Sequence, residues 1–199
     1  MDSDGYLSQL ADIFNGITVN TPSISAIIAI ALAGVLLLAS GFASASEIAF
    51  FSLSPSDRND IDERNHPSDD KISALLGDTE RLLATILITN NFVNVTIIML
   101  CNFFFMNVFV FHSPLAEFLI LTVILTFLLL LFGEIMPKIY SAQKTLAFCR
   151  FSAPGIYFLE KVFRPIATVL VRSTTFLNKH FVKKSHNISV DELSHALEL

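Results

Sequence analysis

The chain has 199 residues, of which 53% are hydrophobic and only 16% are charged, with a net charge of −5 and a mean hydropathy of +0.62. Soluble proteins carry about 25% charged residues, so this composition excludes an ordinary soluble domain. We expect a membrane protein that is surrounded by lipid and has no nucleic-acid partner.

Three apolar runs are each long enough to cross a bilayer as a helix, which takes about 20 residues. They cover residues 24–49, 82–111 and 115–137. The first run follows an acidic segment and is too long for a cleavable signal peptide, so we expect it to stay in the mature protein. The predicted fold class is an all-α membrane protein with three transmembrane helices.

The basic residues predict how the chain is oriented. None lies in residues 1–52, four lie in 53–81, none in 82–137 and nine in 138–199. Lys and Arg collect in cytoplasmic loops. We therefore expect residues 1–23 to be extracytoplasmic and the C-terminus to be cytoplasmic, with the protein in the cell's inner membrane.

The segments outside the three runs predict shorter helices. Residues 53–81 are polar and favour short cytoplasmic helices. Residues 146–182 mix apolar and basic side chains, a pattern typical of helices in the membrane interface. Because Pro154 and Pro165 disrupt helices, we expect a broken set of interfacial helices there and no fourth span. A capping box at Ser189 predicts a new helix in residues 183–199, the start of a cytoplasmic region.

Cysteine and histidine do not suggest a metal site. Cys101 lies in the second span and Cys149 on the predicted cytoplasmic side, too far apart in depth to form a disulfide. The five histidines are scattered over loops and tails, without the short spacings of a zinc site.

Polar residues inside the first two spans need partners in lipid. In the first span, Ser40 and Ser44 share a helical stripe, whereas Ser46 points away from it. Such serines also occur where helices pack closely through small residues. In the second span, three asparagines lie within about one turn: Asn90, Asn91 and Asn94. An interhelical hydrogen-bond network and an ion site are both open interpretations.

The third span supplies a negative charge. Glu134 is ionisable inside the membrane, which makes it a candidate for function. Pro137 has no backbone N–H, so we expect the carbonyl of Gly133 to lose its helical donor beside that carboxylate. Hydroxyls, amide oxygens, a carbonyl and one carboxylate are all oxygen ligands, which favour Mg²⁺ or Ca²⁺ over a soft transition metal.

Three motifs carry a family resemblance: SGFASASE at residues 40–47, TILITNNFVN at 85–94 and FGEIMPK at 132–138. In this order and spacing they resemble the transmembrane domain of the CNNM/CorB/CorC family of magnesium transporters, often labelled DUF21. The resemblance covers roughly residues 24–182. One departure is Thr89, which stands where many relatives have glycine. Some members of the family in gliding bacteria are associated with gliding motility.

The resemblance implies a homodimer with an interfacial juxtamembrane belt, followed by a CBS-pair module that binds ATP. We expect that module to lie outside these 199 residues. It also implies metal ligands, which carry over to Ser40, Ser44, Gly133 and Glu134. Asn91 or one of its neighbours, Asn90 and Asn94, would supply the amide.

The resulting functional hypothesis is Mg²⁺ transport across the cytoplasmic membrane, with Na⁺ as a candidate coupling ion. The alternative is a membrane scaffold or regulator without transport, for example of a gliding-motility machinery. An intramembrane protease using Ser44 or Ser46 would need a base, and no His or Lys is placed in the spans to act as one. We therefore expect a protein that is not an enzyme.

Overall fold

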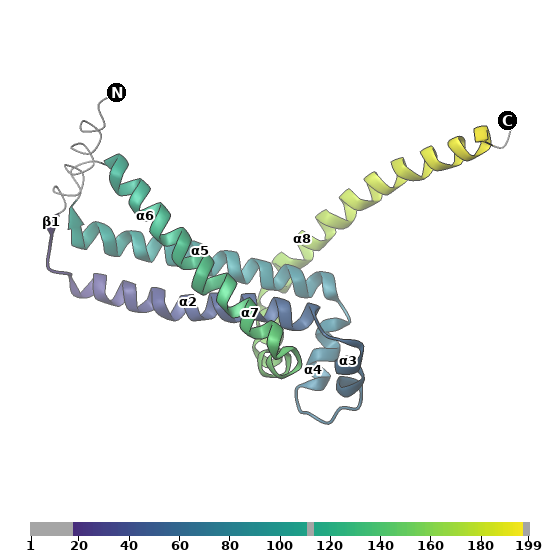
Figure 1. Ribbon diagram of the computed structural model, residues 1–199, viewed down its shortest axis with the longest axis horizontal. Coiled ribbons are helices and arrows are strands. Elements are labelled where there is room, and N and C mark those ends of the chain that lie inside the picture. Colours follow the sequence, from purple (N-terminus) through teal and green to yellow (C-terminus); the bar gives the residue numbers. More distant parts are fainter. Residues whose placement is uncertain (1–17, 111–113, 197–199) are drawn as a thin grey trace.

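The computed structural model describes residues 18–110 and 114–196. Two long helices, α2 (Ile24–Phe51) and α5 (Thr79–Val108), pack side by side along most of their length. A third rod crosses them and consists of α6 (Pro114–Leu128), η1 (Leu129–Ile135) and α7 (Met136–Gln143). Figure 1 shows this bundle, with the short helices α3 (Pro55–Asp62) and α4 (Asp69–Leu76) gathered at one end.

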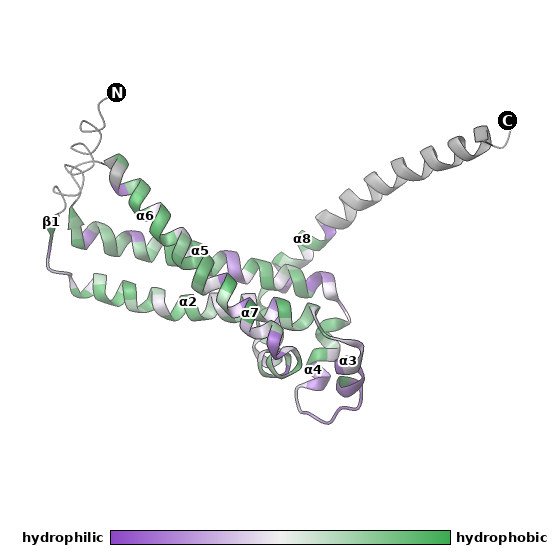
Figure 2. Ribbon diagram, viewed as in Figure 1, coloured by the Kyte–Doolittle hydropathy of each residue, from purple (hydrophilic) through white to green (hydrophobic). Residues whose placement is uncertain are grey.

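Among the residues that the structure describes, three helical segments are long and apolar enough to cross a membrane: Ile24–Phe51, Thr79–Val108 and Glu117–Gln143. In Figure 2 they are predominantly hydrophobic, while α3 is mostly hydrophilic and α4 combines hydrophilic and hydrophobic residues. The predicted all-α membrane fold is therefore confirmed. Of the predicted extracytoplasmic segment, residues 1–17 lie outside the described residues.

Polar caps explain where the helices begin. The Ser23 side chain accepts a hydrogen bond from the backbone of Ala26 at the start of α2. Ser54 and Asp57 form a capping box at α3, and the side chain of Asp78 accepts from the Arg81 N–H at α5. Each cap satisfies a backbone N–H that lacks a partner within its helix. These short polar segments thus fix the boundaries between spans.

A small strand pair closes the end of the bundle opposite α3 and α4. β1 (Thr18–Val19) pairs antiparallel with β2 (Phe109–Val110), with Thr18 opposite Val110. The backbone N–H of Asn20 also donates to the carbonyl of Val108 at 2.7 Å. The start of α2 is therefore tied to the end of α5, which holds the two helices in one register.

The last helix, α8 (Thr145–Ala196), is continuous in the structure. The expected breaks at Pro154 and Pro165 do not occur, so that prediction is wrong, and Ser189 lies inside the helix instead of starting a new one. A proline removes one donor and crowds one carbonyl, a local cost that the rest of a long helix can bear. Both prolines lie on exposed faces, while Ala153 just before Pro154 and Ile156 just after it are fully buried.

Buried side chains attach α8 to the end of the bundle. A core there unites residues of α2, α3, α4, α5 and α8, among them Phe50, Ile61, Ile72, Leu82 and Ile156. A separate core inside the bundle joins α2, α5 and α6 through Ala33, Val93, Ile97, Cys101 and Leu125. The polar cluster described next lies along α2 and α5 between these two cores.

Candidate functional site

The centre of the site is a contact between α2 and α5. The hydroxyl of Ser40 lies 2.8 Å from the amide oxygen of Asn90 and 2.7 Å from that of Asn94. Ser40 is completely buried, and both asparagines are partly buried. A serine hydroxyl has a single proton to donate, so it can satisfy one of these two acceptors at a time. Three oxygens therefore converge with one proton among them.

The other serines of α2 differ in where they point. Ser44 is buried and lies 3.5 Å from the same amide oxygen of Asn90, at the margin of the cluster. Ser46 is equally buried, but its hydroxyl donates to the carbonyl of Phe42 in its own helix. The structure thus brings Ser40 and Ser44 to the cluster and leaves Ser46 out of it.

Asn91 lies on a different face of α5 from its neighbours. Its side chain is exposed and donates to the carbonyl of Leu87 one turn earlier. Of the three asparagines in the predicted ligand set, the two that meet Ser40 are Asn90 and Asn94. Their four-residue spacing places them on the same side of the helix, while Asn91 is rotated by about 100° from Asn90.

Gly133 brings the third span to the same point. A Cβ built on Gly133 would stand 3.1 Å from the hydroxyl oxygen of Ser40. Next to it, a Cβ on Gly41 of α2 would stand 3.0 Å from a ring carbon of Pro137. Two glycines therefore let α2 and η1 approach closely, and all three spans meet at Ser40.

The helix changes its winding where Gly133 and Glu134 lie. Residues Leu129–Ile135 form a π-helical turn, in which the N–H of Met136 donates to the carbonyl of Leu131, five residues back. The next donor in this series would be the N–H of Pro137, and its acceptor would be the carbonyl of Phe132. Proline has no N–H, so this hydrogen bond is missing. That carbonyl oxygen lies 3.4 Å from the position of a Cβ on Gly41. The carbonyl of Gly133 stays a predicted ligand.

Glu134 is half-buried, and its side chain has no hydrogen bond or ion pair with any other residue that the structure describes. The cation nearest to it in sequence, Lys138, is bound instead by Glu47 of α2 at 2.9 Å. The charge of Glu134 is therefore not neutralised by Lys138. An unpaired carboxylate in a spanning helix is costly unless a cation or water is near it.

Sequence reasoning missed two further polar residues. Ser141 of α7 is fully buried and donates to the carbonyl of Ala45 at 2.6 Å, which fastens the third span to α2. Thr85 of α5 is also fully buried, and its hydroxyl has no hydrogen-bond partner among the described residues. The buried positions of these two side chains follow from helix packing, which no local sequence pattern encodes.

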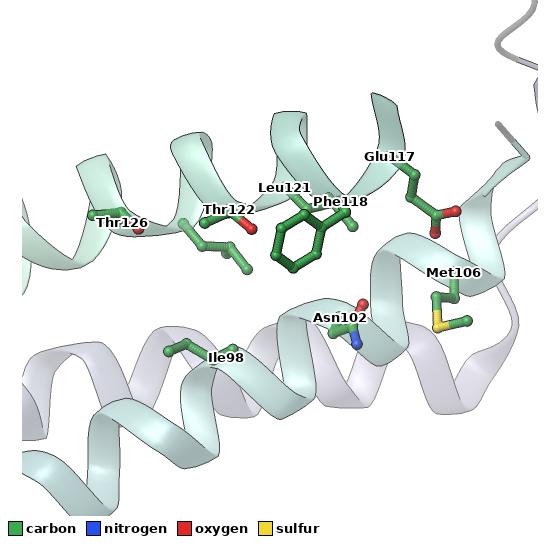
Figure 3. A pocket seen from close by; sticks show the side chains of 9 residues that line it. Ile98, Asn102, Met106, Glu117, Phe118, Leu121, Thr122 and Thr126 are labelled. Atoms are coloured by element: carbon green, nitrogen blue, oxygen red, sulfur yellow. The ribbon is translucent and has the colours of Figure 1, made fainter. Parts of the chain in front are cut away.

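A separate pocket of about 360 Å³ opens between α5 and α6, toward the strand end of the bundle. Figure 3 shows Asn102 and Met106 of α5 facing Glu117, Phe118 and Thr122 of α6 across it. Within the described part of the chain, the side chains of Asn102 and Glu117 have no partner. In those same residues, no group of three or more His, Cys, Asp or Glu could hold a metal ion.

The fold and the site define a multi-pass helical membrane protein with a polar cluster where its three spanning helices meet. The chain belongs to the family of the cyclin M transmembrane N-terminal domain (CNNM), whose model matches residues 31–199. The family resemblance noted in the sequence is thus confirmed. This family is associated with divalent-cation transport across membranes and is not an enzyme class.

Two curated relatives show the same kinship at low identity. A UPF0053 protein of Synechocystis is 26% identical over 140 residues, which is 70% of this chain and 39% of the relative. A UPF0053 protein of Haemophilus influenzae is 29% identical over 136 residues, which is 68% of this chain and 31% of the relative. The aligned part is therefore well under half the length of either relative.

Proposed function

We propose that this chain is the membrane domain of a divalent-cation transporter, with Mg²⁺ as the transported ion. The observation that carries the proposal is the Ser40 hydroxyl facing two amide oxygens with one proton to share. A cation would satisfy these oxygens together, and Mg²⁺ and Ca²⁺ prefer oxygen ligands. Mg²⁺ usually keeps several waters, which suits a site built mostly from neutral oxygens.

Glu134 supplies the charge in this proposal. It adjoins Gly133, which touches Ser40, and it lacks a cationic partner in the described chain. The proposed ligands are Ser40, Ser44, the Gly133 carbonyl and Glu134. For the amide oxygen, we favour Asn90 and Asn94 over Asn91. One carboxylate among neutral oxygens permits both binding and release, as transport requires.

A transported ion needs access to the site from both sides of the membrane. By the distribution of basic residues, we place the end that carries α3 and α4 in the cytoplasm. The pocket between α5 and α6 opens toward the opposite end and contains Asn102 and Glu117. We assign this pocket to the path by which the ion reaches the site from outside the cell. For the longer protein, the proposal also includes a homodimer, Na⁺ coupling and an ATP-binding CBS module.

The proposal is tested by titration calorimetry of the detergent-solubilised chain with Mg²⁺. Ser40→Ala and Glu134→Gln should abolish the binding heat, and Ser44→Ala should weaken it. Ser46→Ala is the matched control, because Ser46 is an equally buried serine of α2 that bonds within its own helix. Binding that is absent in the wild type, or unchanged in Glu134→Gln, contradicts the proposal.

One observation favours a second candidate function, a membrane scaffold or regulator without transport. The bonds from Ser40 to Asn90 and Asn94 join α2 to α5 and could serve helix packing alone. In that case Ser40→Ala should lower the melting temperature equally with and without Mg²⁺. If the site binds the ion, Mg²⁺ should raise the melting temperature of the wild type but not of Ser40→Ala.

A further inference from the structure

Helix α8 presents two different exposed faces beside the face that packs on the protein. Ile156 and Ala167 are completely buried and mark the packed face. Phe158, Val162 and Val169 are exposed by 66%, 52% and 69% on a second face. Their spacing of four and seven residues places them in one stripe. A large apolar stripe exposed on one helix marks a surface for lipid or for a partner.

The third face of α8 is cationic. Lys161, Arg164 and Arg172 are exposed and lie three and eight residues apart, which puts them within one arc of the helix. None of them forms an ion pair with another described residue, and Lys161 stands 4.6 Å over the ring of Tyr157. Over residues 161–184 the sequence has six basic residues and no acidic one. This face therefore lacks negative charge of its own.

The position of α8 fixes the level of these faces relative to the bundle. Glu160 lies 3.8 Å from Arg81, in the first turn of the second spanning helix. Lys161 and the residues that follow it thus leave the bundle at the depth where that span ends. Figure 1 shows α8 departing from the bundle near this end. Lipid headgroups lie at the ends of spanning helices.

We propose that residues 158–172 of α8 bind anionic phospholipid of the adjacent leaflet. The apolar stripe enters the boundary of the acyl chains, and Lys161, Arg164 and Arg172 contact the phosphates of the headgroups. Charge complementarity selects this occupant, because an apolar stripe beside an unpaired cationic face matches an anionic bilayer surface. Glu160 does not compete for these cations, since it is held by Arg81.

The chain contains no tryptophan, so a single tryptophan can report the lipid around α8. We would introduce Val169→Trp on the apolar stripe and reconstitute the full chain into phosphatidylcholine vesicles. Two vesicle preparations are compared, in which the same mole fraction of lipid carries bromine, a quencher of tryptophan fluorescence. The brominated lipid is phosphatidylglycerol in one preparation and phosphatidylcholine in the other. We expect stronger quenching by the brominated phosphatidylglycerol, and a smaller difference at high salt because exposed charges are screened.

Two triple variants of the Val169→Trp protein, each of which removes three positive charges, test the role of the cationic face. Lys161→Gln, Arg164→Gln and Arg172→Gln together should abolish the preference for phosphatidylglycerol while quenching by brominated phosphatidylcholine persists. Arg58→Gln, Arg64→Gln and Lys71→Gln together remove the same charge from α3, α4 and their loop and should leave the preference intact. Equal quenching by the two lipids in the parent reporter overturns the proposal. The proposal is also overturned if neither lipid quenches the reporter, or if the preference for phosphatidylglycerol survives the first triple variant. It is likewise overturned if the second triple variant abolishes that preference too.

Discussion

Ser40 of α2 lies against Gly133 of the π-helical turn, so closely that a Cβ on residue 133 would stand 3.1 Å from the serine oxygen. That oxygen already contacts two amide oxygens of α5. The proposed ion site is therefore built at a junction of three helices with no spare space for one methyl group.

The first prediction concerns that junction. Gly133→Ala should push the Ser40 hydroxyl from its position and weaken Mg²⁺ binding by at least tenfold, a loss of about 1.4 kcal/mol. Gly34→Ala is the control: Gly34 lies in α2, the helix that carries Ser40, and nothing lies within 4 Å of a Cβ there. Titration calorimetry of both variants checks this. Equal affinity of the two variants would show that the junction tolerates the methyl group.

The second prediction separates the three asparagines. Asn90→Ala and Asn94→Ala should each lower Mg²⁺ affinity, because their amide oxygens lie within 2.8 Å of the Ser40 hydroxyl. Asn91→Ala should leave the affinity of the solubilised chain unchanged, because its side chain is exposed on another face. The three isotherms are compared at one pH. A loss confined to Asn91→Ala would contradict the ligand set favoured here.

The third prediction distinguishes a packing serine from a ligand. Ser141→Ala removes the buried hydrogen bond to the carbonyl of Ala45 and should destabilise the protein by about 1 kcal/mol. It should not change Mg²⁺ affinity, since Ser141 contacts α2 beyond the cluster. Thermal unfolding in detergent measures the first effect and calorimetry the second. Loss of binding in a folded Ser141→Ala protein would extend the site to α7.

The fourth prediction follows from a buried ion pair that holds α4 against α8. Arg150 contacts both carboxylate oxygens of Asp69, at 2.9 and 3.1 Å, and Asp69 is fully buried. Burial by itself raises the pKa of Asp69, but the Arg150 guanidinium and the His66 N–H outweigh it and hold that pKa below its usual value. A lowered pKa stabilises the fold above the ordinary pKa of aspartate, and this stabilisation is lost as pH falls through the lowered value.

Cys149, next to Arg150, reports on this clamp. Its thiol is completely buried, and burial raises its pKa to about 12, so it should react only after local opening. Asp69→Asn should accelerate labelling by dithiodipyridine roughly 100-fold at neutral pH, the equivalent of about 3 kcal/mol for breaking a buried pair. The wild type should stay protected until the pH falls below about 4. Cys101 is replaced by alanine so that one thiol reports.

Asp70→Asn is the matched control for the clamp. Asp70 is the neighbouring acid, and its pair with Arg64 at 3.4 Å is exposed on both sides. Exposed pairs contribute little to stability, so labelling of Cys149 should not change. Equal acceleration by Asp69→Asn and Asp70→Asn would mean that the Asp69 ion pair is not what protects the thiol.

Sequence patterns predicted the class of the fold because lipid imposes its own rules. A bilayer requires long apolar helices, so three such runs were enough to predict the three spans. The same reasoning was wrong about α8, where Pro154 and Pro165 were expected to break the helix. Local propensity was overridden there, because the residues between the prolines are held in a buried core.

The motifs also marked the polar residues inside the spans, since each such residue stands out against an apolar run. They did not determine which residues meet. Periodicity put Asn90 and Asn94 on one face of a helix, but only the packing of α2 against α5 turned that face toward Ser40. The π-helical turn and the Glu47–Lys138 pair likewise depend on how the third rod crosses α2.

The sequence by itself determined the membrane environment, the family and the residue types available to a cation, because these follow from hydropathy and from local motifs. Only the tertiary structure decided that Ser40, Asn90, Asn94 and Gly133 share one point and that the Glu134 side chain has no partner in the described part of the chain. The physical reason is that contacts between helices depend on the register and crossing of whole rods, which are set by many small packing contacts at once.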